Sequence, residues 1–169
     1  MRQRLGQHFL QNNRVLEEIS VALEIKEGDK VIEVGAGHGE LTDFLAEAGA
    51  EVTAVEKDKA LVLMLQNKFK NPKDRVEIVE GDILKILGRE TAGLKSLGYK
   101  LAGNIPYYLT GKLLRTVGEL KNKPHLTVFT IQKEVAERVS AKPPKMNLLG
   151  ASVQIWAKPE IVSRVSKKY

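Results

Sequence analysis

Residues 30–41 read Lys-Val-Ile-Glu-Val-Gly-Ala-Gly-His-Gly-Glu-Leu, and this stretch decides the fold. The β-branched run Lys30–Val34 predicts a short strand, and glycines at positions 35, 37 and 39 follow it directly. The residues from Leu41 onward have the pattern of a helix. A strand, a glycine turn and a helix in this order form the first unit of an open α/β sheet, whose ligands bind beyond the carboxyl ends of the strands.

The rest of the chain repeats this alternation. Repeated units of this length predict a mostly parallel, doubly wound α/β sheet with helices on both faces, in one domain over residues 1–169. The further strands are expected at residues 51–55, 75–79, 100–104, 126–131 and 151–156. The helices are expected at residues 12–23, 41–48, 59–69, 109–120 and 134–139, with a loop at 142–145.

Composition excludes several classes of protein. The 169 residues contain no cysteine, which removes disulfides and thiolate sites, and no apolar run is long enough to cross a bilayer. The basic N-terminus lacks a following apolar segment, so we expect no secretory signal and a cytoplasmic location. Net charge is +6, and residues 110–169 carry 12 Lys and Arg against 4 Asp and Glu. This excess predicts either a surface for a polyanion or an ordinary solvated basic face.

The glycine loop favours one cofactor over another. The third glycine of a dinucleotide fingerprint would stand at position 40, which is Glu40. Glycines at 35, 37 and 39 give a tighter spacing, which favours S-adenosylmethionine, a ligand without a pyrophosphate to seat at the helix N-terminus. Gly35 and Gly37 are therefore candidate cofactor contacts, and a glycine-rich turn without a ligand is the alternative.

Two further strand ends carry acidic residues. Glu56 is placed to accept hydrogen bonds from the hydroxyls of a ribose, or else to pair with Lys57 at the surface. Asp82 is placed to accept from an adenine amine while Ile83 packs on the ring, or else it serves only as a turn residue.

The fourth strand ends at Asn104-Ile-Pro-Tyr-Tyr108, which predicts a small rigid pocket with acceptors and an aromatic face. The amine of adenine is a poor nucleophile because its lone pair is delocalised into the ring. We expect the Asn104 side-chain oxygen and the Pro106 backbone carbonyl to accept its two hydrogens, and Tyr107 to stack on the extruded base. Catalysis would then consist of positioning and electrostatics. The alternative is a structural turn with two core tyrosines.

Together these segments resemble the ribosomal RNA adenine-N6,N6-dimethyltransferase family, in particular its small-subunit enzymes. The matching segments are Gly6-Gln-His-Phe-Leu10, Glu33-Val-Gly-Ala-Gly-His-Gly-Glu-Leu-Thr42, Val55-Glu-Lys-Asp58, Glu80-Gly-Asp-Ile-Leu84, Gly103-Asn-Ile-Pro-Tyr-Tyr108 and Ile131-Gln-Lys-Glu-Val135. The resemblance implies a Rossmann-like methyltransferase fold in which residues 1–11 cover the cofactor. The cofactor contacts that it implies, joined to those above, are His8, Leu10, Gly35, Gly37, Glu56, Lys57, Asp82, Ile83 and Asn104.

The resemblance also implies a reaction and its partners. Methyl groups would pass from S-adenosyl-L-methionine, leaving S-adenosyl-L-homocysteine, to two adjacent adenosines in a terminal stem-loop of small-subunit (16S) rRNA. The product would be N6,N6-dimethyladenosine on the immature small subunit, made by a monomer without a metal or a membrane. The residues expected to contact phosphates are Lys112, Arg115, Lys121, Lys123, Arg138, Lys142 and Lys145.

The chain departs from the family pattern at its C-terminal end, because it stops before the small helical domain with which the family continues. Three alternatives stay open. The first is a large-subunit methyltransferase of the antibiotic-resistance type, which shares the Asn-Ile-Pro-Tyr core. The second is a nicotinamide-dependent oxidoreductase, and the third is a non-catalytic ribosome-assembly factor that binds RNA.

Overall fold

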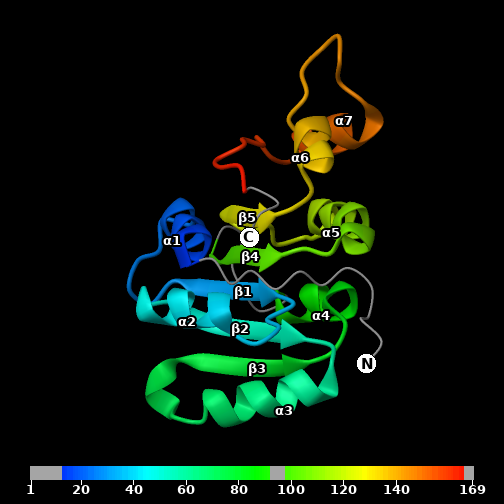
Figure 1. Ribbon diagram of the computed structural model, residues 1–169. Helices are drawn as coiled ribbons and strands as arrows, with labels where there is room; N and C mark the ends of the chain where they lie inside the picture. Colours follow the sequence, from blue (N-terminus) through cyan, green and yellow to red (C-terminus); the bar gives the residue numbers. More distant parts are fainter. Residues whose placement is uncertain (1–12, 92–97, 166–169) are drawn as a thin grey trace, which may run out of the picture.

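The computed structural model describes residues 13–91 and 98–165, and a five-stranded parallel sheet lies at its centre (Figure 1). The strands run in the order β3-β2-β1-β4-β5. They are β1 (Lys30–Val34), β2 (Glu51–Glu56), β3 (Val76–Glu80), β4 (Lys100–Asn104) and β5 (Leu126–Thr130). The helices are α1 (Asn13–Ala22), α2 (Glu40–Glu47), α3 (Lys59–Lys68), α4 (Ile83–Glu90), α5 (Tyr107–Glu119), α6 (Lys133–Val139) and α7 (Leu148–Gln154), with a 3-10 turn at Pro72–Asp74.

Helices cover both faces of the sheet because successive strand residues point to opposite sides. Val31 belongs to a core cluster with apolar side chains of α1, α2 and α3. Its neighbour Ile32 belongs to a second cluster with α4 and α5. A smaller third cluster joins α6 and α7 to Leu114 of α5. The doubly wound α/β arrangement predicted from the sequence is therefore confirmed.

One predicted element is wrong. Residues 151–156 were expected to form a strand because apolar and polar residues alternate there, but the structure places them in and just after helix α7. Asn147 caps this helix, since its side-chain oxygen accepts from the Gly150 N–H at 3.0 Å. Leu149, Val153 and Trp156 recur at helical spacing and pack in the third cluster. The helical spacing of these apolar residues therefore decides the structure of this segment, and the alternation of apolar and polar residues does not.

Helix α4 lies between β3 and β4, where no helix was expected. Asp82 caps its N-terminus, since its Oδ1 accepts from the Leu84 N–H at 3.1 Å. Ile86 and Leu87 are buried against the sheet. In the described part of the chain, no helix is both long and apolar enough to cross a bilayer.

The amino edge of the sheet is closed by an internal ion pair. Lys100, 7% exposed at the start of β4, donates to Asp29 Oδ2 at 2.7 Å and to the Glu24 carbonyl at 2.6 Å. The hydrogen bond from Lys100 holds the pKa of the Asp29 carboxyl below its usual value. This contact joins the end of the α1 segment to the sheet.

Candidate functional site

The candidate residues meet at the carboxyl edge of the sheet. The parallel register aligns β2 with β1 and β3, and β4 with β1 and β5, so the carboxyl ends of the five strands lie side by side. The strand order reverses direction between β1 and β4, which is the position where open α/β sheets bind their ligands. The glycine loop after β1 and Asn104 at the end of β4 stand on the two sides of this point.

The loop between β1 and α2 has a backbone that favours glycine. Gly35, Gly37 and Gly39 have φ angles of 70°, 61° and 82°, which place all three in the left-handed region. The Gly35 N–H donates to the Val55 carbonyl at 2.8 Å, so the loop starts against the end of β2. A Cβ atom at Gly39 would stand 2.8 Å from Leu65 Cδ2, because α3 packs closely there. The loop geometry is therefore fixed from two sides.

Lys68, near the end of α3, braces the same loop. Its ammonium donates to the carbonyls of His38 at 3.3 Å and Gly39 at 3.2 Å. It also pairs with Asp43 Oδ2 of α2 at 2.5 Å. Sequence reasoning missed this residue because its partners lie about thirty positions earlier in the chain.

Glu33 is a buried acid directly behind the loop, and sequence reasoning missed its role as well. The Thr42 hydroxyl lies 2.6 Å from Glu33 Oε2. Burial raises the pKa of Glu33 to about 8, the contact with Thr42 lowers it, and the nearby Glu40 and Asp43 raise it further. The sequence does carry a signal for this role, because Glu33 is a charged residue among the apolar residues Val31, Ile32 and Val34 of β1.

Glu56 ends β2 and is 4% exposed. Its Oε2 accepts from the Gly37 N–H at 3.0 Å, and its Oε1 accepts from the N–H groups of Lys57 at 2.8 Å and Asp58 at 2.9 Å. A carboxylate offers about four acceptor positions, so backbone donors take three of them. Oε2 keeps one acceptor position, so one hydroxyl of a diol could bind there beside Gly37, while a second hydroxyl at Oε1 would share or replace a bond to Lys57 or Asp58. The loop and the carboxylate are thus coupled, and the predicted ribose contact is a proposal.

Asp82, Lys57 and Ile83 lie together at the neighbouring strand end. Asp82 caps α4 with one oxygen, and its Oδ2 lies 3.5 Å from Lys57 Nζ. The turn function that sequence reasoning kept as an alternative is therefore real, and the second oxygen still faces Lys57. Ile83 is 5% exposed and belongs to the core cluster of α4 and α5, so little of its surface is left for an adenine ring.

The backbone after Asn104 corrects one predicted role. Helix α5 begins at Tyr107 rather than at residue 109, and Pro106 is its N-cap. The Pro106 carbonyl accepts from the N–H groups of Leu109 at 2.9 Å and Thr110 at 3.2 Å, and from the Thr110 hydroxyl at 3.1 Å. It is therefore committed to the helix and not to a base. Among the described residues, no donor reaches the carbonyl of Ile105.

Two aromatic rings stand at the mouth of the site. Tyr107 is 53% exposed and Tyr108 is 59% exposed, so neither is the core residue that the structural alternative requires. Their ring centroids are 5.8 Å apart and their planes meet at 88°. An exposed aromatic ring three residues beyond Asn104 is available to stack on a planar ligand.

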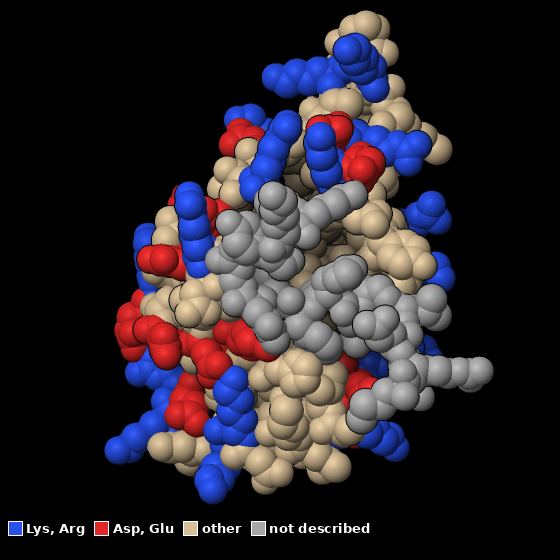
Figure 2. Space-filling model, viewed as in Figure 1, with Lys and Arg blue, Asp and Glu red and all other residues tan. Residues whose placement is uncertain are grey.

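The basic residues predicted to contact RNA fall into two groups. Arg115 and Lys121 lie exposed on and after α5, and Arg138, Lys142 and Lys145 lie exposed on α6 and the loop that follows it. Figure 2 shows Lys and Arg side chains over the upper part of the molecule, where Figure 1 places α6 and α7. Lys123 differs, because its ammonium donates to the Leu120 carbonyl at 2.9 Å and so stabilises the end of α5.

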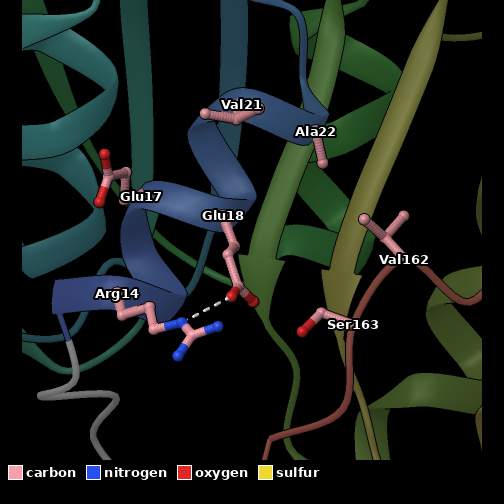
Figure 3. A pocket seen from close by; sticks show the side chains of 7 residues that line it. All are labelled: Arg14, Glu17, Glu18, Val21, Ala22, Val162 and Ser163. Atoms are coloured by element: carbon pink, nitrogen blue, oxygen red, sulfur yellow. Dashed lines mark hydrogen bonds and ion pairs between the residues drawn. The ribbon is translucent and has the colours of Figure 1, made fainter.

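A hollow of about 390 Å³ lies between α1 and residues 162–163, away from the predicted contacts (Figure 3). Arg14 and Glu18, which form an ion pair at 3.1 Å, contribute to its lining. None of the predicted cofactor or substrate residues among the described residues lines it. His8 and Leu10 lie outside the described residues, and so does the rest of segment 1–11.

The sequence matches known proteins along its whole length. A family model described as ribosomal RNA adenine dimethylase matches residues 1–169. A protein of Dehalococcoides mccartyi (strain ATCC BAA-2266) named ribosomal RNA small subunit methyltransferase A is 43% identical over 97% of this chain and 56% of its own length. A protein of the same name from Synechococcus sp. (strain CC9311) is 41% identical over 91% of this chain and 57% of its own length. The chain thus spans little more than half the length of these relatives.

Solved structures agree on the fold. A dimethyladenosine transferase from Plasmodium falciparum matches with a TM-score of 0.71 at 24% identity, over 88% of this chain and 52% of that one. The 23S rRNA methyltransferase ErmE matches with a TM-score of 0.62 at 25% identity, over 79% and 51% of the two chains. The Rossmann-like methyltransferase fold is therefore confirmed. With a family match over its full length and relatives above 40% identity, this chain belongs to the ribosomal RNA adenine dimethylase family.

Proposed function

We propose that this chain carries the catalytic part of an S-adenosylmethionine-dependent rRNA adenine-N6,N6-dimethyltransferase. Its substrate would be two adjacent adenosines in a stem-loop of small-subunit rRNA, presented on the immature small subunit. The observation that carries the proposal is the placement of Asn104 beside the glycine loop and three residues before an exposed tyrosine, in a member of this family. The name of the relatives supports the choice of the small subunit.

The residues at the carboxyl edge fit the proposed cofactor. Glu56 and Asp82 offer acceptors suited to hydroxyl and amine donors, and their negative charge would repel a phosphate group. The left-handed glycines of the loop let backbone approach a ligand closely. When bound, S-adenosylmethionine supplies a methyl group activated by a positively charged sulfur. Gly35, Gly37, Glu56 and Asp82 would hold it, with His8 and Leu10 as further proposed contacts.

The residues after β4 would orient the target base. The Asn104 side-chain oxygen would accept one hydrogen of the adenine amine. We assign the second acceptor to the Ile105 carbonyl, because helix α5 already occupies the Pro106 carbonyl. Two acceptors on one amine draw its hydrogens to one side and direct its lone pair to the other. Tyr107 would stack on the base, and Pro106 would fix the turn that joins the two groups.

Replacement of Asn104 by Ala tests the proposal. We expect methyl transfer to immature small subunits, measured with tritiated donor and by nucleoside analysis for N6,N6-dimethyladenosine, to fall by about 100-fold or more, since a fixed hydrogen-bonding group in an active site contributes about that much. RNA binding should stay unchanged. Asn67→Ala, on the exposed side of α3, is the matched control and should leave both quantities unaltered.

Two outcomes would favour other functions. If neither this chain nor a chain completed with the C-terminal part of a longer relative transfers methyl groups, the non-catalytic assembly factor is correct. If the methylated product appears in large-subunit rRNA instead, the resistance-type activity is correct, an alternative that the similarity to ErmE supports. The monomeric state and the cytoplasmic location stay predictions, which light scattering and cell fractionation would check.

A further inference from the structure

We propose that the exposed face of α5 binds the RNA strand next to the target base, with Tyr108 against a neighbouring base and with Lys112 and Arg115 on its phosphates. This inference rests on the proposed function, because it takes the occupant of the site to be RNA. It joins the phosphate contacts expected of Lys112 and Arg115 to a base contact at Tyr108 and defines the direction in which the strand leaves the reacting centre.

The helix presents these three side chains on one side. Positions 108, 112 and 115 follow the spacing of neighbours on a helical surface, and all three residues are exposed. Leu113 and Val117, on the opposite side, are fully buried against the sheet. Because a helix rises about 1.5 Å per residue, the two cations lie about 6 Å and about 10 Å along the axis from Tyr108. The face therefore begins beside the site and leads away from it.

The two tyrosines present their rings to different ligands. Their planes are nearly perpendicular, at 88°, with centroids 5.8 Å apart. One flat base cannot lie face to face with both rings at once. If Tyr107 stacks on the target base, Tyr108 is available to a second base of the same strand, since stacking on an aromatic ring tolerates any base.

The two cations have no acidic partner in the described structure. Neither Lys112 nor Arg115 forms an ion pair with another described residue, although Glu119 stands four positions after Arg115. Elsewhere the same spacing does give ion pairs, as in Arg14 with Glu18 and Lys133 with Glu137. Unpaired cations beside an exposed aromatic ring are the chemistry that single-stranded nucleic acids bind.

Gly111 adds an independent observation. A glycine inside a helix costs about 1 kcal/mol relative to alanine. Packing explains Gly118 of the same helix, because a Cβ atom there would stand 2.6 Å from Trp156 Nε1. At Gly111 a Cβ atom would meet nothing within 4 Å, so no contact inside the described protein requires the glycine. A strand that passed close to the helix between Tyr108 and Lys112 would account for the glycine.

The first test measures binding of a fluorescein-labelled hairpin RNA, with two adjacent adenosines in its loop, by anisotropy over a range of salt concentrations. Lys112→Met and Arg115→Met should each lower the slope of log K against log salt by about 0.7, the contribution of one phosphate contact on a single strand. Lys30→Met, at the exposed start of β1, is the control and should leave the slope unchanged. Tyr108→Leu should weaken binding at least about 5-fold, and Tyr108→Phe should not.

The second test uses two glycines in equivalent settings. Gly111→Gln should weaken binding of the same hairpin at least about 5-fold and leave the unfolding midpoint equal or higher, because glutamine favours helices. Gly88, exposed inside α4, also has nothing within 4 Å of a Cβ atom, so Gly88→Gln should leave the midpoint equal or higher in the same way and leave RNA binding unchanged.

The possible results of these binding measurements separate the inference from the proposed function. If the wild-type chain binds the hairpin but the α5 variants bind it equally well, the inference is wrong and the proposed function stands. If neither the wild-type chain nor a chain completed with the C-terminal part of a longer relative binds RNA, the proposed function fails together with the inference. If a poly-glutamate peptide displaces the hairpin as effectively as unlabelled RNA does, the face recognises acidic chains in general and the inference is also overturned.

Discussion

At the amino edge of the sheet, Lys100 is 7% exposed and its charge is balanced by the carboxylate of Asp29 at 2.7 Å. At the carboxyl edge, Glu56 is also buried, yet among residues 13–91 and 98–165 its carboxylate meets the N–H groups of Gly37, Lys57 and Asp58 and no cation. The two charges of a side-chain ion pair cancel, whereas a carboxylate that accepts hydrogen bonds from backbone N–H groups keeps its net negative charge. The comparison shows that one edge closes with an ion pair while the other keeps a net negative charge, which fits the proposed cofactor contact of Glu56.

The largest effect on stability should come from removing the ion pair at the amino edge of the sheet. Lys100→Met leaves the Glu24 carbonyl without its donor and Asp29 with the Lys26 N–H alone, and we expect it to lower the free energy of unfolding by about 3 kcal/mol in urea titrations. Lys30→Met is the control at the same edge. Cofactor affinity of the folded variant should match that of the wild type, and a large loss of affinity would contradict the division between the two edges.

The same variant should change the response to acid. Because the folded-state pKa of Asp29 is lowered, its contribution is present above the unfolded-state pKa and is lost as pH falls through the folded-state value. Unfolding titrations of the wild type should show this loss in acid, and Lys100→Met should show a smaller loss, because the Lys26 N–H still lowers the pKa of Asp29.

A second effect should appear behind the glycine loop. Glu33 has a folded-state pKa of about 8 against an ordinary value of 4.5, so the native state holds a proton that the unfolded chain releases as pH rises. The wild type should therefore lose about 2 kcal/mol of stability between pH 6 and pH 8 relative to Glu33→Gln. The measurement is the difference in the free energy of unfolding between the two proteins at each pH. The change of this difference with pH does not depend on any constant destabilisation caused by the amide of the Glu33→Gln variant. A constant difference across this range would show that Glu33 is ionised in the native state.

The smallest effect should sharpen the description of the carboxyl edge. Lys68→Met removes the donor to the His38 and Gly39 carbonyls, and the freer loop should bind S-adenosylmethionine about 5- to 10-fold more weakly, which corresponds to about 1 kcal/mol. Equilibrium dialysis measures this change, and Lys70→Met, exposed just beyond α3, is the matched control. Equal affinities in the two variants would mean that packing of α3 alone fixes the loop.

Sequence patterns predicted the regular parts of the fold well. The bounds of β1 and β4 match the expected ranges 30–34 and 100–104, because short runs bounded by turn residues have few other solutions. Helix α7 was mistaken for a strand because six residues are too few to separate the two periods. The packing of Val153 and Trp156 against Val139, which decides the matter, is a tertiary contact.

The candidate site was predicted in position but not in detail. The strand ends and the glycines could be located from the sequence, since parallel strands bring their carboxyl ends together. The Pro106 carbonyl was assigned to the base because α5 was expected to begin at residue 109, and a start at Tyr107 commits that carbonyl to the helix. Lys68 could not be found, because its role depends on where α3 ends relative to the loop.

Only Ile105 and Pro106 separate Asn104, the last residue of β4, from Tyr107, the first residue of α5. A link this short couples any rotation of the helix to the strand end, so the backbones of these residues shift together. If the proposed function holds, differences in RNA preference would then have to arise elsewhere, for example at residues 140–147 between α6 and α7.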